Sequence, residues 1–150
     1  MKLISGFLMI FFMTIPKIAW GQDCLVRSTP VNFGNYDLLA ASPLNSTGSI
    51  TVTCSLGIPY TIKLDQGQNS GGSFQQRKMG SSVGGKALSY NLYRDSSRTE
   101  VWGDGTSNTF VVLGIGTGSN QNFTIYGRIP GRQKVRVGPF NDTITVIIEW

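Results

Sequence analysis

Histidine does not occur anywhere in the 150 residues of this sequence. A Ser-His-Asp triad is therefore impossible, and the side chain that most often serves as a general acid or base near neutral pH is missing. The 8 acidic residues stand singly along the chain, and no G-x-S-x-G nucleophile elbow occurs. A glycosidase whose two carboxylates are brought together by folding is the remaining enzymatic alternative. The composition thus predicts a protein that is not an enzyme and needs no cofactor.

Cysteine is scarce, with Cys24 and Cys54 as the whole set and no C-x-x-C spacing. Without histidine to complete a ligand set, we expect no metal site. Two cysteines in an exported protein are expected to form a disulfide, whereas free thiols are the alternative. The bridge would close a loop of about 30 residues and stabilise the fold by roughly 3–4 kcal/mol in the chain-entropy model.

Long apolar runs are also absent, except for one near the start that covers residues 3–15. That run is about 13 residues long, whereas a membrane-spanning helix needs roughly 20. Lys2 precedes it and the small residues of Ala19-Trp20-Gly21 follow it, which is the pattern of a secretory signal. We predict a cleaved signal peptide at residues 1–21 and a mature domain at residues 22–150, with an N-terminal membrane anchor as the alternative.

Charge is sparse, since charged residues make up 14% of the chain. Loss of Lys2 and Lys17 with the signal would leave 11 basic and 8 acidic residues, which lowers the net charge from +5 to +3. So mild an excess does not indicate a nucleic-acid partner. One basic cluster lies near a turn, and we interpret it as a solvated loop: Arg128, Arg132, Lys134 and Arg136.

No stretch shows a helical period with caps, whereas short alternating runs separated by glycine and small polar residues are frequent. This pattern is typical of an all-β sandwich or barrel in one domain. We predict strands at residues 24–28, 31–36, 49–55, 59–65, 86–94, 108–113, 122–129 and 142–150, with a further short strand around 74–79. The short link Leu56-Gly57-Ile58 predicts that the strands on either side of it form a hairpin.

Two tryptophans are candidate contacts for a sugar, because an indole ring offers a large apolar face with one polar group. Trp150 belongs to an alternating strand, which favours core packing. Trp102 lies in a turn-rich stretch and is the possible surface-binding residue.

Several segments together resemble the spore coat protein U domain family. The segments, in chain order, are FGNYD at 33–37, ITVTCS at 50–55, RKMG at 77–80, LSYNLYRDSSRTEVWGDG at 88–105, YGRIPGRQ at 126–133 and DTITVIIEW at 142–150. The fourth segment is the most specific, and the resemblance covers essentially the whole mature chain.

The family includes subunits of archaic chaperone–usher pili of Gram-negative bacteria. The resemblance implies an incomplete immunoglobulin-like β-sandwich that lacks its final strand. A periplasmic chaperone lends a strand first, and an adjacent pilus subunit donates one in the fibre, which is β-strand addition. It also implies an outer-membrane usher as a partner, export to the cell surface in a fimbrium, and a role in adhesion and biofilm toward an unknown surface or host ligand.

On this resemblance the run 142–150 is the last strand, and its edge accepts the donated strand. A long apolar edge is an aggregation hazard unless something covers it. The internal alternative is pairing with the region 74–79. The expected acceptor groove has one wall made by Ile144, Val146, Ile148 and Trp150 and the other by Val26 and Phe33.

In the predicted mature chain only Gln22 and Asp23 precede Cys24. A donor strand needs roughly ten alternating residues, at about 3.3 Å each. The expectation is a subunit that accepts a strand without giving one, at the tip or another terminal position of a fibre. The alternative function is a self-complete secreted carbohydrate- or surface-binding module that uses Trp102.

Overall fold

The computed structural model describes residues 23–150, and the predicted signal peptide lies outside the described residues. The described part is all-β, and none of its residues forms a helix that would cross a membrane. The strands are β1 (Cys24–Thr29), β2 (Leu44–Cys54), β3 (Pro59–Leu64), β4 (Arg77–Ser81), β5 (Leu88–Tyr93), β6 (Val112–Ile115), β7 (Gln121–Ile129), β8 (Phe140–Asn141) and β9 (Val146–Glu149).

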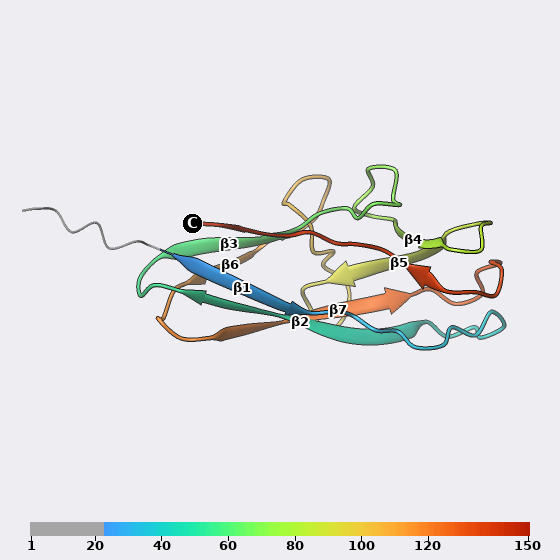
Figure 1. The fold of residues 1–150 in the computed structure, drawn as a ribbon, viewed down its shortest axis with the longest axis horizontal. Coiled ribbons are helices and arrows are strands. Elements are labelled where there is room, and N and C mark those ends of the chain that lie inside the picture. Colours follow the sequence, from blue (N-terminus) through green and yellow to red (C-terminus); the bar gives the residue numbers. More distant parts are fainter. Residues whose placement is uncertain (1–22) are drawn as a thin grey trace, which may run out of the picture.

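The strands form two sheets that face each other, as Figure 1 shows. The larger sheet has the order β1-β2-β7-β5-β4-β8, and the smaller has the order β6-β3-β9. All of these pairings are antiparallel. The all-β class predicted from the alternating runs is therefore confirmed.

The core lies between the sheets and follows the period-2 alternation of the strands. β2 buries Ile50 and Val52 while its threonines face outward, and β3 buries Ile62 and Leu64 in the same way. Burying an aliphatic side chain of this size contributes about 1.5–3 kcal/mol. The remaining buried apolar residues of this cluster are Cys54, Tyr60, Leu88, Tyr90, Leu92, Trp102, Ile125 and Ile129.

The predicted hairpin around Leu56-Gly57-Ile58 is wrong. The Ile58 amide donates to the Ser55 carbonyl at 3.2 Å and Gly57 has a φ of 80°, so a tight turn does form there. However, β2 belongs to the larger sheet and β3 to the smaller one. Both edges of β2 are already paired, with β1 and β7, so the turn carries the chain across the core to the opposite sheet.

The strand predicted at 31–36 is also wrong, because this segment joins no ladder. The short strand expected around 74–79 is β4, which begins at Arg77 and pairs with β5 and β8. It does not pair with β9, so the internal alternative for covering the last strand is not realised.

Candidate functional site

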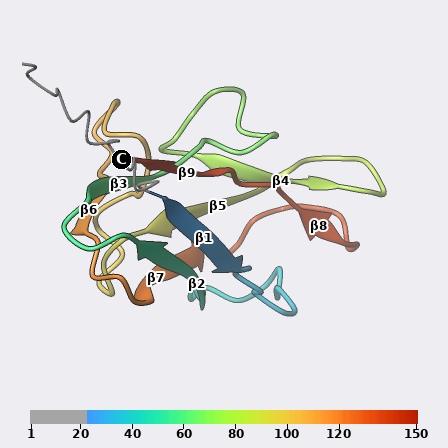
Figure 2. The ribbon, with the colours of Figure 1, turned by 60° about the vertical axis from the view of Figure 1, so that its left-hand side comes forward.

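Two strand edges are left open on the same groove. Within the described residues β9 pairs with β3 alone, and β1 pairs with β2 alone. The two strands belong to different sheets, and Figure 2 shows both of them. Each open edge presents backbone N–H and C=O groups that seek partners.

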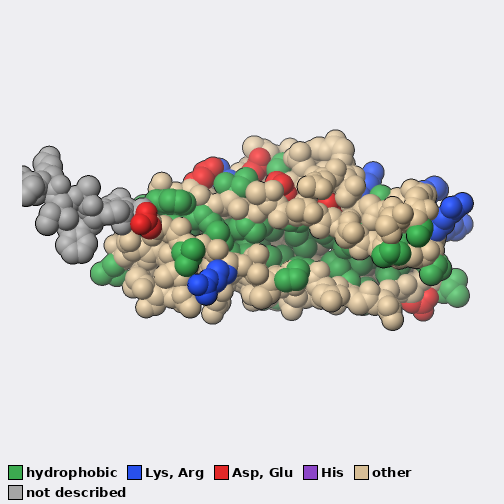
Figure 3. Space-filling model, in the orientation of Figure 1, with side chains coloured by type: hydrophobic (Ala, Val, Ile, Leu, Met, Phe, Trp, Pro, Cys, Tyr) green, Lys and Arg blue, Asp and Glu red, His purple; other side chains and the backbone are tan. Residues whose placement is uncertain are grey.

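The groove has a volume of about 900 Å³ and runs between two stretches of chain. One wall is residues 28–36 with Leu38, and the other is residues 135–144 with Val146. Its floor is made of core side chains: Leu64, Met79, Leu88, Tyr90, Leu92, Ile125 and Ile129. Figure 3 shows apolar side chains along the middle of this face. The groove is therefore an opening into the hydrophobic core.

Two glycines let the first wall lie close to the larger sheet. A Cβ at Gly48 of β2 would lie 2.7 Å from the Thr29 carbonyl oxygen, and one at Gly127 of β7 would lie 2.6 Å from the Phe33 ring. Phe33 also meets Tyr90 edge to face, with ring centroids 6.2 Å apart. Side chains at the two glycine positions would push this wall into the groove.

A polar pair interrupts the apolar lining. The Tyr90 hydroxyl donates a hydrogen bond to Asp142 Oδ2 at 2.7 Å. The other carboxylate oxygen accepts from the Gln68 amide and from Asn69 Nδ2, each at 3.0 Å. Burial, and then the hydrogen bond to the Asp142 carboxylate, raise the pKa of Tyr90, so its hydroxyl keeps its proton and remains a donor.

The disulfide links Cys24 to Cys54, with their Cα atoms 4.1 Å apart. These residues face each other in the register of β1 and β2. The bridge therefore ties the start of the edge strand β1 to the end of its one strand neighbour among the described residues. It lies beyond the groove lining and supports the groove indirectly, by holding β1 in register.

The groove brings together three of the residues predicted for it. Ile144 and Val146 lie on one wall and Phe33 on the other. Ile148 packs against the core without lining the groove. Val26 and Trp150 lie outside the lining, with 38% and 60% of their surface exposed. The core position favoured for Trp150 is thus wrong.

The surface role considered for Trp102 is also wrong. Its side chain is fully buried, and the indole N–H donates to the Ile62 carbonyl at 3.1 Å. Its backbone amide donates to the Leu92 carbonyl, so residue 102 runs beside β5 although its neighbours form turns. The turn residues around Trp102 predict the bends in the chain, but they do not predict that residue 102 itself runs beside β5 between those bends.

Several lining residues were missed. The segment 135–141 has little alternation, and Tyr90 reads as an ordinary core residue of β5. The strong alternation of 142–150 is the signal that located the second wall. Among residues 23–150, no three histidine, cysteine or acidic side chains come together in a way that would hold a metal ion.

An all-β sandwich with an open groove between two sheet edges places the protein in the class of immunoglobulin-like pilus-subunit folds. The chain belongs to the spore coat protein U domain family, whose model, described as Spore Coat Protein U domain, matches residues 11–147. The family predicted from the sequence segments is thus confirmed. A curated relative is "Protein U" of Myxococcus xanthus, 32% identical over an alignment of 129 residues, and the match covers 80% of this chain and 71% of the relative.

A similar solved structure is the CsuC–CsuE chaperone–tip adhesion subunit pre-assembly complex from archaic chaperone-usher Csu pili of Acinetobacter baumannii. The TM-score is 0.63 at 25% identity, and the match covers 85% of this chain and 40% of that chain. This chain thus spans less than half the length of the chain it matches. The minor tip subunit HdaB of the E. coli Hda pilus aligns with a TM-score of 0.44 at 11% identity, over 83% of this chain and 79% of that one.

Proposed function

We propose that the protein is a structural and adhesive subunit of an archaic chaperone–usher pilus and that its groove accepts a strand from another molecule. The observation that carries this proposal is the groove itself, which opens into the core. Its lining includes Ser28 and Thr29 at the end of β1 and Val146 at the start of β9, and each of these strands has one strand partner among the described residues. Membership of the family and likeness to a chaperone-bound pilus subunit support it.

Strand addition satisfies both physical demands of this site. The main chain of an added strand supplies partners for the backbone groups of an open edge, and its alternate side chains fill the apolar floor. In this proposal Phe33, Ile144 and Val146 contact the added strand directly. Val26, Ile148 and Trp150 flank its far end, where β1 and β9 run beyond the lining.

The partners follow from this mode of binding. A periplasmic chaperone covers the groove after export, an outer-membrane usher receives the complex, and an adjacent subunit then replaces the chaperone strand. The domain at residues 22–150 thereby reaches the cell surface of a Gram-negative bacterium in a fimbrium, after a signal peptide at 1–21 is removed. We assign no catalytic residue and no cofactor to the groove, in keeping with a structural role.

We further propose a tip or terminal position in the fibre, on the likeness to a tip adhesion subunit. Immunogold labelling of isolated fibres tests this point. Gold particles at fibre ends are the expected result, whereas labelling along the whole fibre would contradict a terminal position and leave strand acceptance standing.

Export of the full chain with and without its chaperone tests the proposal. Alone, the protein is expected to aggregate or be degraded, and with the chaperone it is expected to form a soluble one-to-one complex. A soluble monomer that unfolds cooperatively without any chaperone would overturn strand acceptance.

A matched pair of variants on β9 tests whether the chaperone contacts the subunit within the groove. Val146 lines the groove, whereas the side chain of Ile147 points to the other face of the strand and is exposed. We expect Val146→Asp to abolish the chaperone complex and Ile147→Asp to retain it. Equal loss in both variants would argue against the groove as the contact.

A further inference from the structure

A second hollow is lined by residues of three loops. Figure 1 shows these loops at the end of the molecule opposite the C-terminus. The loops are residues 36–41, 81–86 and 130–139. The Arg132 amide donates to the Ala40 carbonyl at 3.0 Å, and the Ser82 amide donates to the Pro139 carbonyl at 3.4 Å. The three loops are thus held together as one surface.

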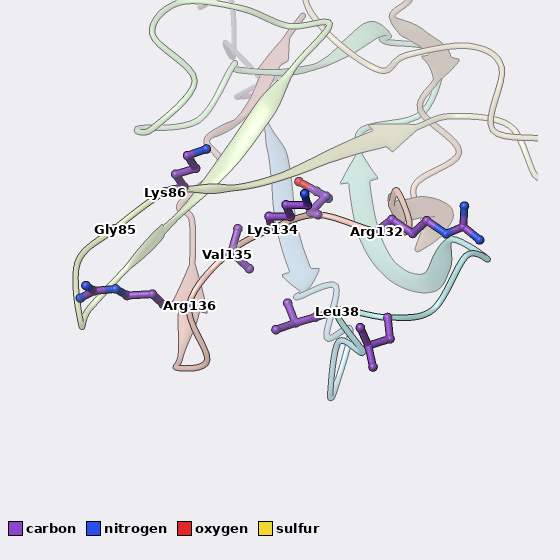
Figure 4. A pocket seen from close by; sticks show the side chains of 9 residues that line it. Leu38, Gly85, Lys86, Arg132, Lys134, Val135 and Arg136 are labelled. Atoms are coloured by element: carbon purple, nitrogen blue, oxygen red, sulfur yellow. The ribbon is translucent and has the colours of Figure 1, made fainter.

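The hollow has a volume of about 720 Å³ and combines leucines with cations. Its lining includes Leu38, Leu39, Lys86, Arg132, Lys134 and Arg136. Figure 4 shows Leu38 and Val135 between the side chains of Arg136 and Arg132. We call the surface formed by the residues that line this hollow the basic hollow. Arg136 also borders the groove described above.

The cations of the basic hollow have no anionic partner among the described residues. The ion pairs within the described part of the chain are Lys63–Glu149 and Arg94–Glu100, and neither pair includes a residue of the basic hollow. Asp37, which directly precedes the lining residue Leu38, uses its carboxylate to accept the Leu39 amide at 2.8 Å. Lys86, Arg132, Lys134 and Arg136 are all exposed, so their positive charge faces solvent without neutralisation.

Aliphatic side chains project beside these cations. Leu39 is 88% exposed, and Val83 stands on the neighbouring loop. Val137, which also lines the groove, is 87% exposed. Figure 3 shows apolar and basic side chains together at this end of the molecule. No aromatic ring belongs to the described residues that line the hollow, so it offers no platform on which a sugar would stack.

We propose that the basic hollow binds the surface of an anionic lipid bilayer. Cations near a bilayer attract anionic headgroups, and adjacent aliphatic side chains enter the boundary between headgroups and acyl chains. A soluble polyanion would use the cations but would leave the exposed leucine and valine side chains in water. The presence of both kinds of side chain on one surface therefore favours a lipid surface. This binding goes beyond strand acceptance and does not depend on it.

Co-sedimentation with vesicles tests the proposal. The full chain, exported and recovered from the periplasm, is mixed at physiological salt with vesicles of phosphatidylcholine alone or of phosphatidylcholine with phosphatidylglycerol. We expect binding to the anionic vesicles only. If the protein is recovered with its chaperone, the chaperone alone serves as the blank.

Matched variants separate the two contributions. Lys134→Glu is expected to weaken vesicle binding by roughly fivefold or more, since each cation near an anionic bilayer has about that effect. Leu39→Ser is expected to weaken it about tenfold through lost burial of the leucine. The controls are Arg27→Glu on β1 and Leu56→Ser on the turn at the other end, which is 80% exposed, and neither should change binding.

Three results would overturn the proposal. The first is absence of binding to anionic vesicles, and the second is equal weakening by the control variants. The third is binding to a soluble polyanion such as heparin that depends on Lys134 but not on Leu39. Arg132→Glu provides a second charge variant if Lys134→Glu fails to fold, as judged by thermal unfolding. Each sample is also assayed for the chaperone complex, so that failure of lipid binding is distinguished from failure of strand acceptance.

Discussion

The guanidinium of Arg77 is fully buried inside the sandwich. It donates to the Asp65 carbonyl at 3.0 and 2.6 Å, to the Trp102 carbonyl at 2.8 Å and to Asn91 Oδ1 at 2.8 Å. Burial lowers the pKa of Arg77 because it disfavours the charged form. The Arg77 side chain thus links β4 to β5 through Asn91, and it also links β4 to the backbone at Asp65 and at Trp102.

Replacement of this side chain should be costly. Arg77→Met would leave two buried acceptors and one half-buried acceptor without their donor, at about 1–3 kcal/mol each, so we expect a loss of about 3 kcal/mol. Thermal unfolding of the subunit in its purified chaperone complex measures the loss. Arg27→Met, an exposed change on β1, is the control and should stay within about 0.5 kcal/mol of the parent. A similar small effect for both variants would show that the network contributes little.

Tyr90 gives a prediction with a pH dependence. Its pKa is raised by burial and by Asp142, whereas the unfolded-state value is 10.0. The stabilisation from the protonated phenol is therefore fully present below about pH 10 and is lost as the pH rises further, since the unfolded state then releases a proton that the folded state retains. Tyr90→Phe removes the phenol and with it this pH-dependent contribution to stability.

The comparison needs both proteins, because burial also raises the pKa of Tyr60 and Tyr93. We expect the parent to lose more stability than Tyr90→Phe between about pH 10 and pH 11, and the two proteins to respond alike between about pH 8 and pH 9. Both subunits are compared in their chaperone complexes by denaturant unfolding, and parallel curves over the whole pH range would contradict the role assigned to the Tyr90–Asp142 pair.

At the scale of single elements, β1 is held by one strand neighbour within residues 23–150 and by the disulfide to Cys54. Replacing both cysteines by serine should cost roughly 3–4 kcal/mol, through the greater freedom of the unfolded chain. It should also open β1 to proteolysis before the central strands β2 and β7. In the chaperone complexes, a reductant should lower the unfolding midpoint of the parent subunit and leave that of the double variant unchanged. An effect of reductant on the double variant would point to another cause.

The elements show which local signals are sufficient. β2, β3, β5 and β7 alternate clearly and pack one face inward, so their positions were predictable. The segment 31–36 also alternates, yet it forms no ladder, because it crosses the inner face of β2 and β7 over Gly48 and Gly127. Alternation reports that a segment has a buried face and does not report whether its backbone has a strand partner.

At the scale of the whole molecule, the wall made by Ile144 and Val146 was predictable, because one uninterrupted pattern encodes it. The Tyr90–Asp142 hydrogen bond and the burial of Trp102 were not, since each joins residues about 40–50 positions apart and depends on how the two sheets stack. The basic hollow likewise gathers residues from three loops. In the sequence it reads only as a basic turn.

A last prediction concerns how the sandwich is closed. The central strands β2 and β7 have partners on both edges, so their amides should exchange slowly in any folded form. Among the described residues β9 pairs with β3 alone, so the amides on its other edge would gain strand partners from an added strand. In the chaperone complex, hydrogen exchange should therefore show the β9 amides protected on both edges, at rates approaching those of β7. If β7 is protected while half of the β9 amides exchange as fast as the loop 66–73, the chaperone binds elsewhere. The open edge would then be a feature of the folded subunit, and it would not be the place where the sandwich is completed.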